Sequence, residues 1–172
     1  MNEEVHNIIR SVHKLFNDKR LTLALAESCT GGLLSHYMTL LPGSSAFFQA
    51  GLVTYSNASK LGLLGLAPDT LERYGVISEA VAREMAEKVR ALVKTDYALA
   101  TTGNLGPEAL EGKKRGLIYI AVNTWGKTVV KELLLTGDRA ANKEKASYFA
   151  MRFLFETVME KSPESAQRNI KR

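Results

Sequence analysis

The feature that most constrains the fold is a short, mainly apolar run that passes into a Gly-rich turn and then into a helical pattern. Leucine and alanine dominate positions 21–26, Ser28, Cys29 and Thr30 follow, and Gly31 and Gly32 precede apolar residues at helical spacing. A strand that ends in a tight turn and opens a helix has this pattern. The sequence therefore predicts an α/β unit with a polar turn between its strand and its helix.

This turn is a candidate ligand site, although many strand–turn–helix junctions are only structural. Glycine lets the backbone approach a ligand closely. The first amides of a helix lack internal partners, and the helix dipole favours negative charge there. Ser28 and Cys29 are both possible nucleophiles, and their spacing does not distinguish them. A phosphate, a carboxylate or a developing oxyanion would suit such a turn.

Strands and helices alternate along most of the chain. Expected helices cover residues 3–17, 30–41, 68–74 and 139–160, with a short helix capped by Asn57 and an amphipathic helix capped by Ser78, whose buried face includes Leu92. Asp138 is the expected N-cap of the last helix. Expected strands cover residues 21–26, 47–55 (buried on both faces), 97–101, 116–124 and 128–135, the last two forming an antiparallel hairpin. This order predicts one α/β domain over residues 1–160, a mixed sheet with helices on both faces.

The distribution of charge argues against nucleic acid as the partner. The net charge is +5, of which residues 161–172 carry +3, and we expect this basic segment to be a flexible tail. No apolar run is long enough to span a membrane, and the first residues lack the apolar core of a signal peptide. One cysteine excludes an internal disulfide, and no metal-binding spacing is present. We expect a cytoplasmic protein without a metal or other cofactor.

Polar residues follow three of the predicted strands. Besides the turn at Ser28, Tyr55 and Lys60 follow one strand and Thr102 follows another. Ligands bind beyond the carboxyl ends of strands in open α/β sheets, so convergence of these ends would build a polar pocket. Lys60 can act as a base if burial lowers its pKa, and Tyr55 can relay a proton or donate to an oxyanion. The alternative is an exposed lysine and a core tyrosine.

The other candidates near these strand ends are one arginine and the histidines. His6, His13 and His36 are expected on helix surfaces and not in a site. Arg139 lies in the first turn of the last predicted helix, where a cation opposes the helix dipole. Its position suggests an anionic partner such as a phosphate, and the alternative is a surface pair with Asp138.

An ordered set of short motifs resembles the CinA C-terminal domain family over about residues 5–158. The motifs are Ala26–Gly32, Pro42–Ser45, Tyr55–Asn57 with Lys60, Gly75–Ser78, Thr102-Gly103 and Gly137–Arg139. Stand-alone members of that family are nicotinamide-nucleotide amidohydrolases. The resemblance implies hydrolysis of the carboxamide of nicotinamide mononucleotide to nicotinate mononucleotide and ammonia, by a homodimer that needs no cofactor.

The resemblance also assigns roles to residues. The implied catalytic set is Ser28 as nucleophile with Tyr55, Lys60 and Thr102. The implied substrate-binding set is Thr30, Gly31, Gly32, Asn57, Gly103 and Arg139. The amides of Gly31 and Gly32, together with Thr102, are expected to stabilise the oxyanion.

The sequence departs from the family pattern in one loop and at one basic position. A Gly-rich segment usual in the family here contains Glu108, Ala109, Leu110 and Glu111, which have less backbone freedom than glycine and add negative charge. Lys143 stands where the family usually has arginine, so bidentate geometry is lost. These changes keep a second hypothesis open, a nucleotide- or phosphate-binding module of the same family with weak or no catalysis.

Overall fold

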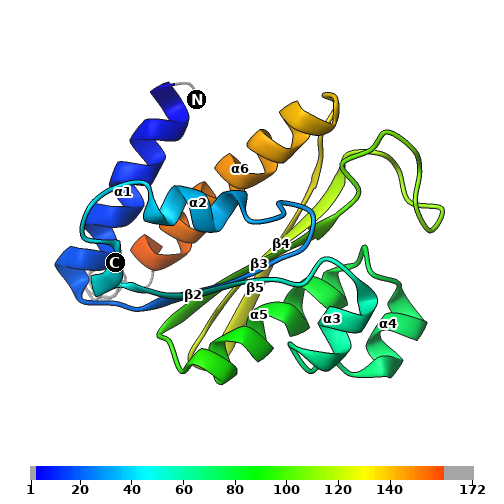
Figure 1. Ribbon diagram of the computed structural model, residues 1–172, viewed down its shortest axis with the longest axis horizontal. Helices are drawn as coiled ribbons and strands as arrows, with labels where there is room; N and C mark the ends of the chain where they lie inside the picture. The colour runs from blue at the N-terminus through cyan, green and yellow to red at the C-terminus, as the bar shows by residue number, and fades with distance from the viewer. Residues whose placement is uncertain (1–2, 161–172) are drawn as a thin grey trace, which may run out of the picture.

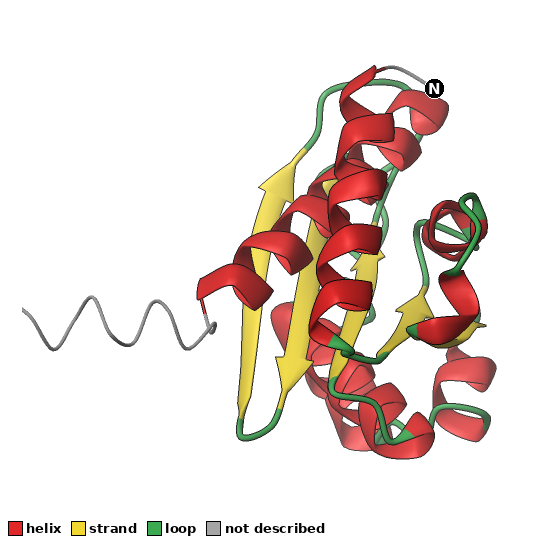
Figure 2. Ribbon diagram, turned by 90° about the vertical axis from the view of Figure 1, so that its left-hand side faces the viewer, coloured by secondary structure: helices red, strands yellow, loops and turns green. Residues whose placement is uncertain are grey.

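In the computed structural model, which describes residues 3–160, five strands form one mixed sheet (Figure 1, Figure 2). The strands are β1 (Leu23–Glu27), β2 (Phe48–Val53), β3 (Tyr97–Gly103), β4 (Leu117–Thr124) and β5 (Lys127–Leu134), in the spatial order β2-β1-β3-β4-β5. β1 pairs in parallel with β2 and β3, whereas β4 pairs antiparallel with β3 and β5. The predicted mixed sheet and its late hairpin are confirmed.

Helices cover both faces of this sheet, as predicted. On one face lie α1 (Glu3–Lys19), α2 (Leu33–Thr39) and α6 (Arg139–Glu160) (Figure 1). On the other lie α3 (Asn57–Gly62), α4 (Pro68–Tyr74) and α5 (Glu79–Val93). A short 3-10 helix, Ser44–Ala46, precedes β2.

The central strands separate large and small side chains between the two faces. On the α1 and α6 side, the core includes Leu25 and Leu99, whereas on the α5 side the neighbouring strand residues are alanines such as Ala24 and Ala98. Successive strand residues point to opposite faces, so this alternation leaves room for α5 to pack closely on the sheet. α5 fills that space with Val81, Met85 and Val89, all fully buried, each contributing about 1.5–3 kcal/mol by burial.

The helix caps follow the sequence in two places and differ in one. Ser78 Oγ accepts a hydrogen bond from Val81 N at 3.2 Å, and Asp138 Oδ1 accepts one from Ala141 N at 2.8 Å, as predicted. Asn57 is not the cap of α3. Ser56 caps it, because Ser56 Oγ accepts from Ser59 N while Ser59 Oγ accepts from Ser56 N, which is a capping box.

Three burial predictions are wrong, because the presence or absence of a covering neighbour cannot be read from local sequence. β2 is an edge strand whose residues alternate between half-buried and exposed, and it is not buried on both faces. Leu92 lies near the end of α5 and is 57% exposed. His13 is buried, because α2 and Phe47 cover it, and its Nε2 lies 2.9 Å from Met38 O. Desolvation lowers the pKa of His13 despite that bond.

The sheet register places the three predicted polar strand ends side by side. Glu27, the last residue of β1, is opposite Val53 on β2 and Thr101 on β3. All three strands run in the same direction, so their carboxyl ends meet at one edge of the sheet. Ser28, the Thr54–Lys60 segment and Thr102 therefore lie next to one another.

Candidate active site

A cavity of about 190 Å³ lies where these strand ends meet. Its lining includes predicted site residues from all three, together with one from the start of α6: Ser28, Tyr55, Asn57, Lys60, Thr102, Gly103 and Arg139. Cys29, the other possible nucleophile, also lines it, as do four residues that sequence reasoning did not select: Val76, Asn104, Leu105 and Leu110. Thr30, Gly31 and Gly32 do not line it. The structure thus brings together most, though not all, of the predicted site residues.

Lys60 is buried against Ser28. Only 1% of Lys60 is exposed, and its Nζ lies 3.1 Å from Ser28 Oγ and 2.9 Å from Thr54 O. Burial lowers the pKa of Lys60, while Cys29 and Glu111 act in the opposite direction. The alternative of an exposed lysine is therefore wrong. Because the pKa of Lys60 is lowered, its neutral amine, the form that can take a proton from Ser28, is populated at lower pH than in an ordinary lysine.

Cys29, the other possible nucleophile, is buried in a setting that suppresses thiolate formation. Burial raises the pKa of Cys29 to about 12, although a hydrogen bond with Thr101 lowers it. A thiol attacks as the thiolate, so Cys29 is unreactive near neutral pH. The geometry and the charge therefore both favour Ser28.

Glu27 holds the turn that carries Ser28, and sequence reasoning did not select it as a site residue. Its side chain is fully buried, and its two oxygens accept five hydrogen bonds of 2.7–3.1 Å. The donors are Thr30 Oγ1, Gly32 N, Leu34 N, Ser35 N and Ser35 Oγ. A carboxylate at the N-terminus of α2 is favoured by the unpaired amides and the helix dipole. The sequence did carry a signal for Glu27, because it is an acidic residue directly before a turn that opens a helix.

Because Glu27 occupies this helix end, the predicted anion-binding role of the turn needs revision. Gly32 N donates to Glu27, and Gly31 N donates to Ser28 O at 3.1 Å. Neither amide is left free for an oxyanion. Thr30 Oγ1 is also engaged, with Glu27 and with Thr101. Among the described residues, the turn amides that donate to no other residue are those of Cys29 and Thr30.

Thr102 is also engaged in this structure. Thr102 Oγ1 donates to Val76 O at 2.6 Å, which ties the end of β3 to the segment that precedes α5. A hydroxyl that donates its one hydrogen to a carbonyl can only accept from another group. The predicted donation from Thr102 to an oxyanion would require this bond to break.

Tyr55 and Arg139 lie together at the mouth of the cavity. Arg139 Nη2 donates to the Tyr55 hydroxyl at 2.5 Å, and Nη1 donates to Gly106 O at 2.5 Å. Tyr55 is 58% exposed, so it is not a core residue, and the partners of Arg139 show that it does not form the alternative surface pair with Asp138. Tyr55 accepts from Arg139 and therefore keeps its own O–H for a ligand.

Lys143 lies next to the Ser28 turn. A Cβ built on Gly31, whose φ is +53°, would lie 3.4 Å from Lys143 Nζ, so the ammonium lies directly beside this glycine. Together with Arg139, it places positive charge near the same edge of the sheet.

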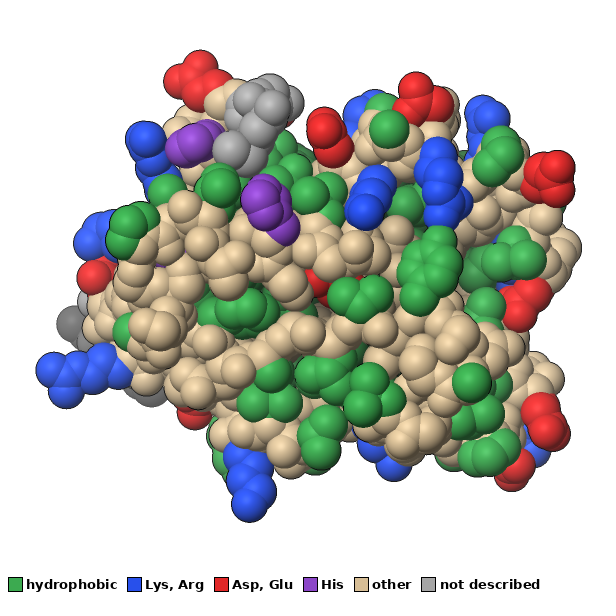
Figure 3. Space-filling model, viewed as in Figure 1, with side chains coloured by type: hydrophobic (Ala, Val, Ile, Leu, Met, Phe, Trp, Pro, Cys, Tyr) green, Lys and Arg blue, Asp and Glu red, His purple; other side chains and the backbone are tan. Residues whose placement is uncertain are grey.

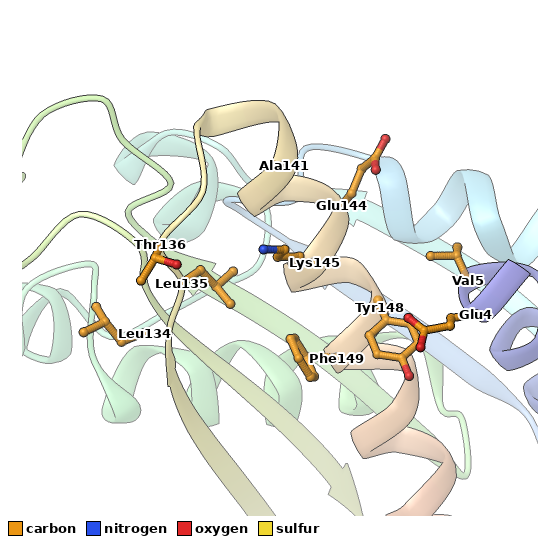
Figure 4. Close-up of a pocket in the computed structure, with 10 residues that line it drawn as sticks. All are labelled: Glu4, Val5, Leu134, Leu135, Thr136, Ala141, Glu144, Lys145, Tyr148 and Phe149. Atoms are coloured by element: carbon orange, nitrogen blue, oxygen red, sulfur yellow. The ribbon is translucent and has the colours of Figure 1, made fainter. Parts of the chain in front are cut away.

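A larger cavity, of about 380 Å³, lies elsewhere, between the start of α1, the end of β5 and the first turns of α6 (Figure 4). Its lining residues are Glu4, Val5, Leu134, Leu135, Thr136, Ala141, Glu144, Lys145, Tyr148 and Phe149. None of these is a serine or a cysteine, so this cavity lacks the nucleophile and the buried base found at Ser28. We therefore take the smaller cavity as the candidate active site.

Charge on the face shown in Figure 3 does not single out another site. On the face shown in Figure 3, lysine and arginine side chains are interspersed with acidic ones and do not form a continuous basic surface.

Within residues 3–160, no group of three or more His, Cys, Asp or Glu side chains is arranged to hold a metal ion. None of the helices in that range is both long enough and apolar enough to cross a membrane.

Comparison with curated proteins gives relatives from bacteria. The chain is 43% identical over 152 residues to a protein of Alkaliphilus oremlandii and 47% identical over 138 residues to one of Caldanaerobacter subterraneus, both named as competence-damage inducible. These alignments cover 88% and 80% of this chain but only 37% and 33% of the relatives. The chain therefore spans about a third of the length of the curated relatives it matches.

Solved structures of similar length have the same fold. A competence or damage-inducible protein from Enterobacter asburiae is 34% identical with a TM-score of 0.88, and the match covers 91% of this chain and 99% of that one. A competence damage-inducible protein A from Klebsiella pneumoniae is 31% identical with a TM-score of 0.89, covering 92% and 99%. The CinA C-terminal domain matches residues 5–158, which is nearly the whole described structure. The chain belongs to the CinA C-terminal domain family.

Proposed function

We propose that this protein hydrolyses the carboxamide of nicotinamide mononucleotide, with Ser28 as nucleophile and Lys60 as base. The observation that carries the proposal is the contact of 3.1 Å between Lys60 Nζ and Ser28 Oγ within the cavity. A serine is a poor nucleophile until a nearby group takes its proton, and a buried lysine can do so in its neutral form. The resemblance of the site motifs to nicotinamide-nucleotide amidohydrolases supplies the substrate.

The reaction proceeds by acyl transfer in two steps. Ser28 Oγ attacks the carboxamide carbon while its proton passes to Lys60 Nζ, and the tetrahedral intermediate then loses ammonia as that proton moves to the leaving nitrogen. A water molecule attacks the resulting ester, Lys60 again takes and returns the proton, and the acid is released. The bond from Lys60 to Thr54 O holds the amine towards Ser28 throughout.

The rest of the cavity supports binding of the substrate outside the reacting amide. A volume of about 190 Å³ is below the range of 300–1,000 Å³ usual for whole small-molecule sites, so the ring enters while ribose and phosphate remain at the mouth. Arg139 and Lys143 supply positive charge for the phosphate there, and the free O–H of Tyr55 can donate to the substrate. The amide of Cys29, a residue that lines the cavity, replaces those of Gly31 and Gly32 as the proposed oxyanion donor.

The test is ammonia release from nicotinamide mononucleotide by the purified protein. We expect Ser28→Ala to reduce the rate by about 10³-fold or more. Cys29→Ala is the matched control, since it changes the adjacent buried residue and should leave most of the activity. Equal loss of activity in both variants would show that the substitutions disrupt the turn. Loss of activity in Cys29→Ala alone would contradict the proposal and identify Cys29 as the nucleophile.

A second candidate function is a binding module that holds the nucleotide without turnover. The loop at Glu108–Glu111 favours it, since this loop departs from the family pattern while its Leu110 lines the cavity and offers apolar surface to a bound ring. If the folded protein releases no ammonia, titration calorimetry with nicotinamide mononucleotide distinguishes this function from loss of binding. The homodimer implied by the family resemblance remains a proposal, which sedimentation at several protein concentrations would test.

A further inference from the structure

The loop between β3 and β4 carries a strained turn next to the cavity. It projects beyond the carboxyl end of β3, on the side where α3 and α4 lie (Figure 1). Lys113 N donates to Leu110 O at 2.9 Å, and the two residues between them, Glu111 and Gly112, have φ of +53° and +67°. Two successive positive φ angles define a type I′ turn, whose first central position prefers Asn, Asp or Gly. Glutamate there is a strained choice, costing on the order of 1–2 kcal/mol.

The side chain of Glu111 supplies a reason for this strain. Its Oε1 accepts a hydrogen bond from Val76 N at 3.3 Å, and its Oε2 accepts one from Ile77 N at 3.4 Å. Each bond is long, but both are made by one carboxylate. Gly75 allows the approach, since a Cβ at Gly75 would lie 2.6 Å from Glu111 Oε2. The carboxylate therefore fastens the turn at 110–113 to the segment that precedes α5.

Both ends of this contact adjoin the wall of the cavity. Val76 lines the cavity and its carbonyl accepts the hydrogen bond from Thr102. Leu110, the residue before Glu111, also lines the cavity, yet it is 51% exposed. An exposed leucine at a cavity wall leaves apolar surface for a bound ring to cover, which favours binding.

We propose that Glu111 is a positioning residue that latches the loop onto residues 75–77 and so fixes Leu110 as the wall against which the substrate ring packs. This inference rests on the proposed function and deepens it, because it assigns ring recognition to the loop in which this chain departs from its family. Glu111 also acts on the base by charge, since it raises the pKa of Lys60 against the larger effect of burial.

Two substitutions distinguish the contact of the Glu111 carboxylate with Val76 and Ile77, here called the latch, from the conformation of the turn itself. Glu111→Asn places a favoured residue in the type I′ turn but shortens the side chain, so the turn is relieved and the contact with Val76 and Ile77 is lost. Glu111→Gln keeps the length but offers one acceptor oxygen in place of two. Glu108→Gln is the matched control, with the same loss of charge in the same loop, because the amides of Val76 and Ile77 donate to Glu111 and not to Glu108.

The first measurement is amide hydrogen exchange at Val76 and Ile77, followed by NMR, which does not depend on activity. We expect faster exchange in Glu111→Asn and Glu111→Gln than in wild type, and no change in Glu108→Gln. Unchanged exchange in both Glu111 variants would overturn the latch. This result stands whether or not the protein proves to be an amidohydrolase.

The second measurement is the KM for nicotinamide mononucleotide, or the Kd from calorimetry if no ammonia is released. We expect both Glu111 variants and Leu110→Ala to raise it by about tenfold with a smaller change in kcat, because ring packing is lost before the chemical step. Faster exchange with an unchanged KM or Kd in the Glu111 variants would overturn the positioning role, because the contact with residues 75–77 would then be lost without any effect on binding.

Discussion

At the scale of single residues, two buried ionisable side chains, Glu27 and Lys60, differ in how many hydrogen-bond partners surround them. Glu27 accepts five hydrogen bonds, so the cost of burying its charge is offset by donors fixed around it. Lys60 has two acceptors, Ser28 Oγ and Thr54 O, and no carboxylate within residues 3–160 forms a salt bridge with it. Glu27 therefore stabilises the turn, whereas Lys60 is held in a form that readily gives up its proton.

This difference makes stability depend on pH through Lys60. Burial lowers the folded-state pKa of Lys60 below its ordinary value of 10.5, so between these two values the unfolded chain binds more protons than the folded one. The free energy of unfolding contributed by Lys60 should therefore rise with pH up to about 10.5. Replacing the lysine by methionine removes this dependence.

We expect the free energy of unfolding of wild type to increase relative to that of Lys60→Met as pH is raised through the alkaline range. Urea unfolding at a series of pH values measures the difference. Lys88→Met, which changes an exposed lysine on α5, serves as the control and should follow wild type. Parallel curves for wild type and Lys60→Met would contradict a lowered pKa.

At the scale of elements, α3 and α5 both begin at a serine cap but have different tasks. α5 is a 15-residue helix with a buried face that covers the sheet. α3 has six residues, too few to be stable alone, and it carries Lys60. The cap of α5 therefore serves the stability of the whole protein, whereas the cap of α3 serves the placement of one side chain.

Removing the two caps should separate stability from activity. We expect Ser78→Ala to lower the free energy of unfolding by about 1 kcal/mol, since the first turn of a core helix loses its cap. Ser56→Ala should lower it less, because local fraying of α3 exposes little buried surface, yet reduce ammonia release more. Urea unfolding and rate measurements on the same samples give the comparison. Equal loss of stability with full activity in Ser56→Ala would contradict it.

At the scale of the whole molecule, one sheet joins the two halves of the core. The strands β1, β3 and β4 contribute alternate residues to the core under α1 and α6 and to the core under α5. Neither layer can separate without exposing the opposite face of the same strands. The cooperativity of folding therefore follows from the sheet and not from either helical layer.

We expect thermal unfolding of the chain to be a single transition. The calorimetric and van't Hoff enthalpies should agree, and far-UV circular dichroism should follow the same curve as the near-UV signal from buried tyrosines such as Tyr97. Two separated transitions would show that the helical layers unfold independently, contrary to the shared strands.

The sequence by itself determined the order and type of the elements. Hydrophobic periodicity located α1, α5 and α6, and turn chemistry located α4 with Gly75 after it and the hairpin of β4 and β5. The polar residues after β1, β2 and β3 also indicated one common site, because neighbouring parallel strands bring their carboxyl ends together. These properties depend on residues close together in the chain.

Only the tertiary structure decided which side chains are buried, paired or free. It buried His13 and Lys60, exposed Leu92, and gave the Gly32 amide to Glu27. The contacts of Arg139 with Tyr55 and of Glu111 with Val76 and Ile77 join segments far apart in the sequence. Periodicity is a property of contiguous residues, whereas burial and hydrogen-bond partners depend on segments that meet only when the sheet has formed.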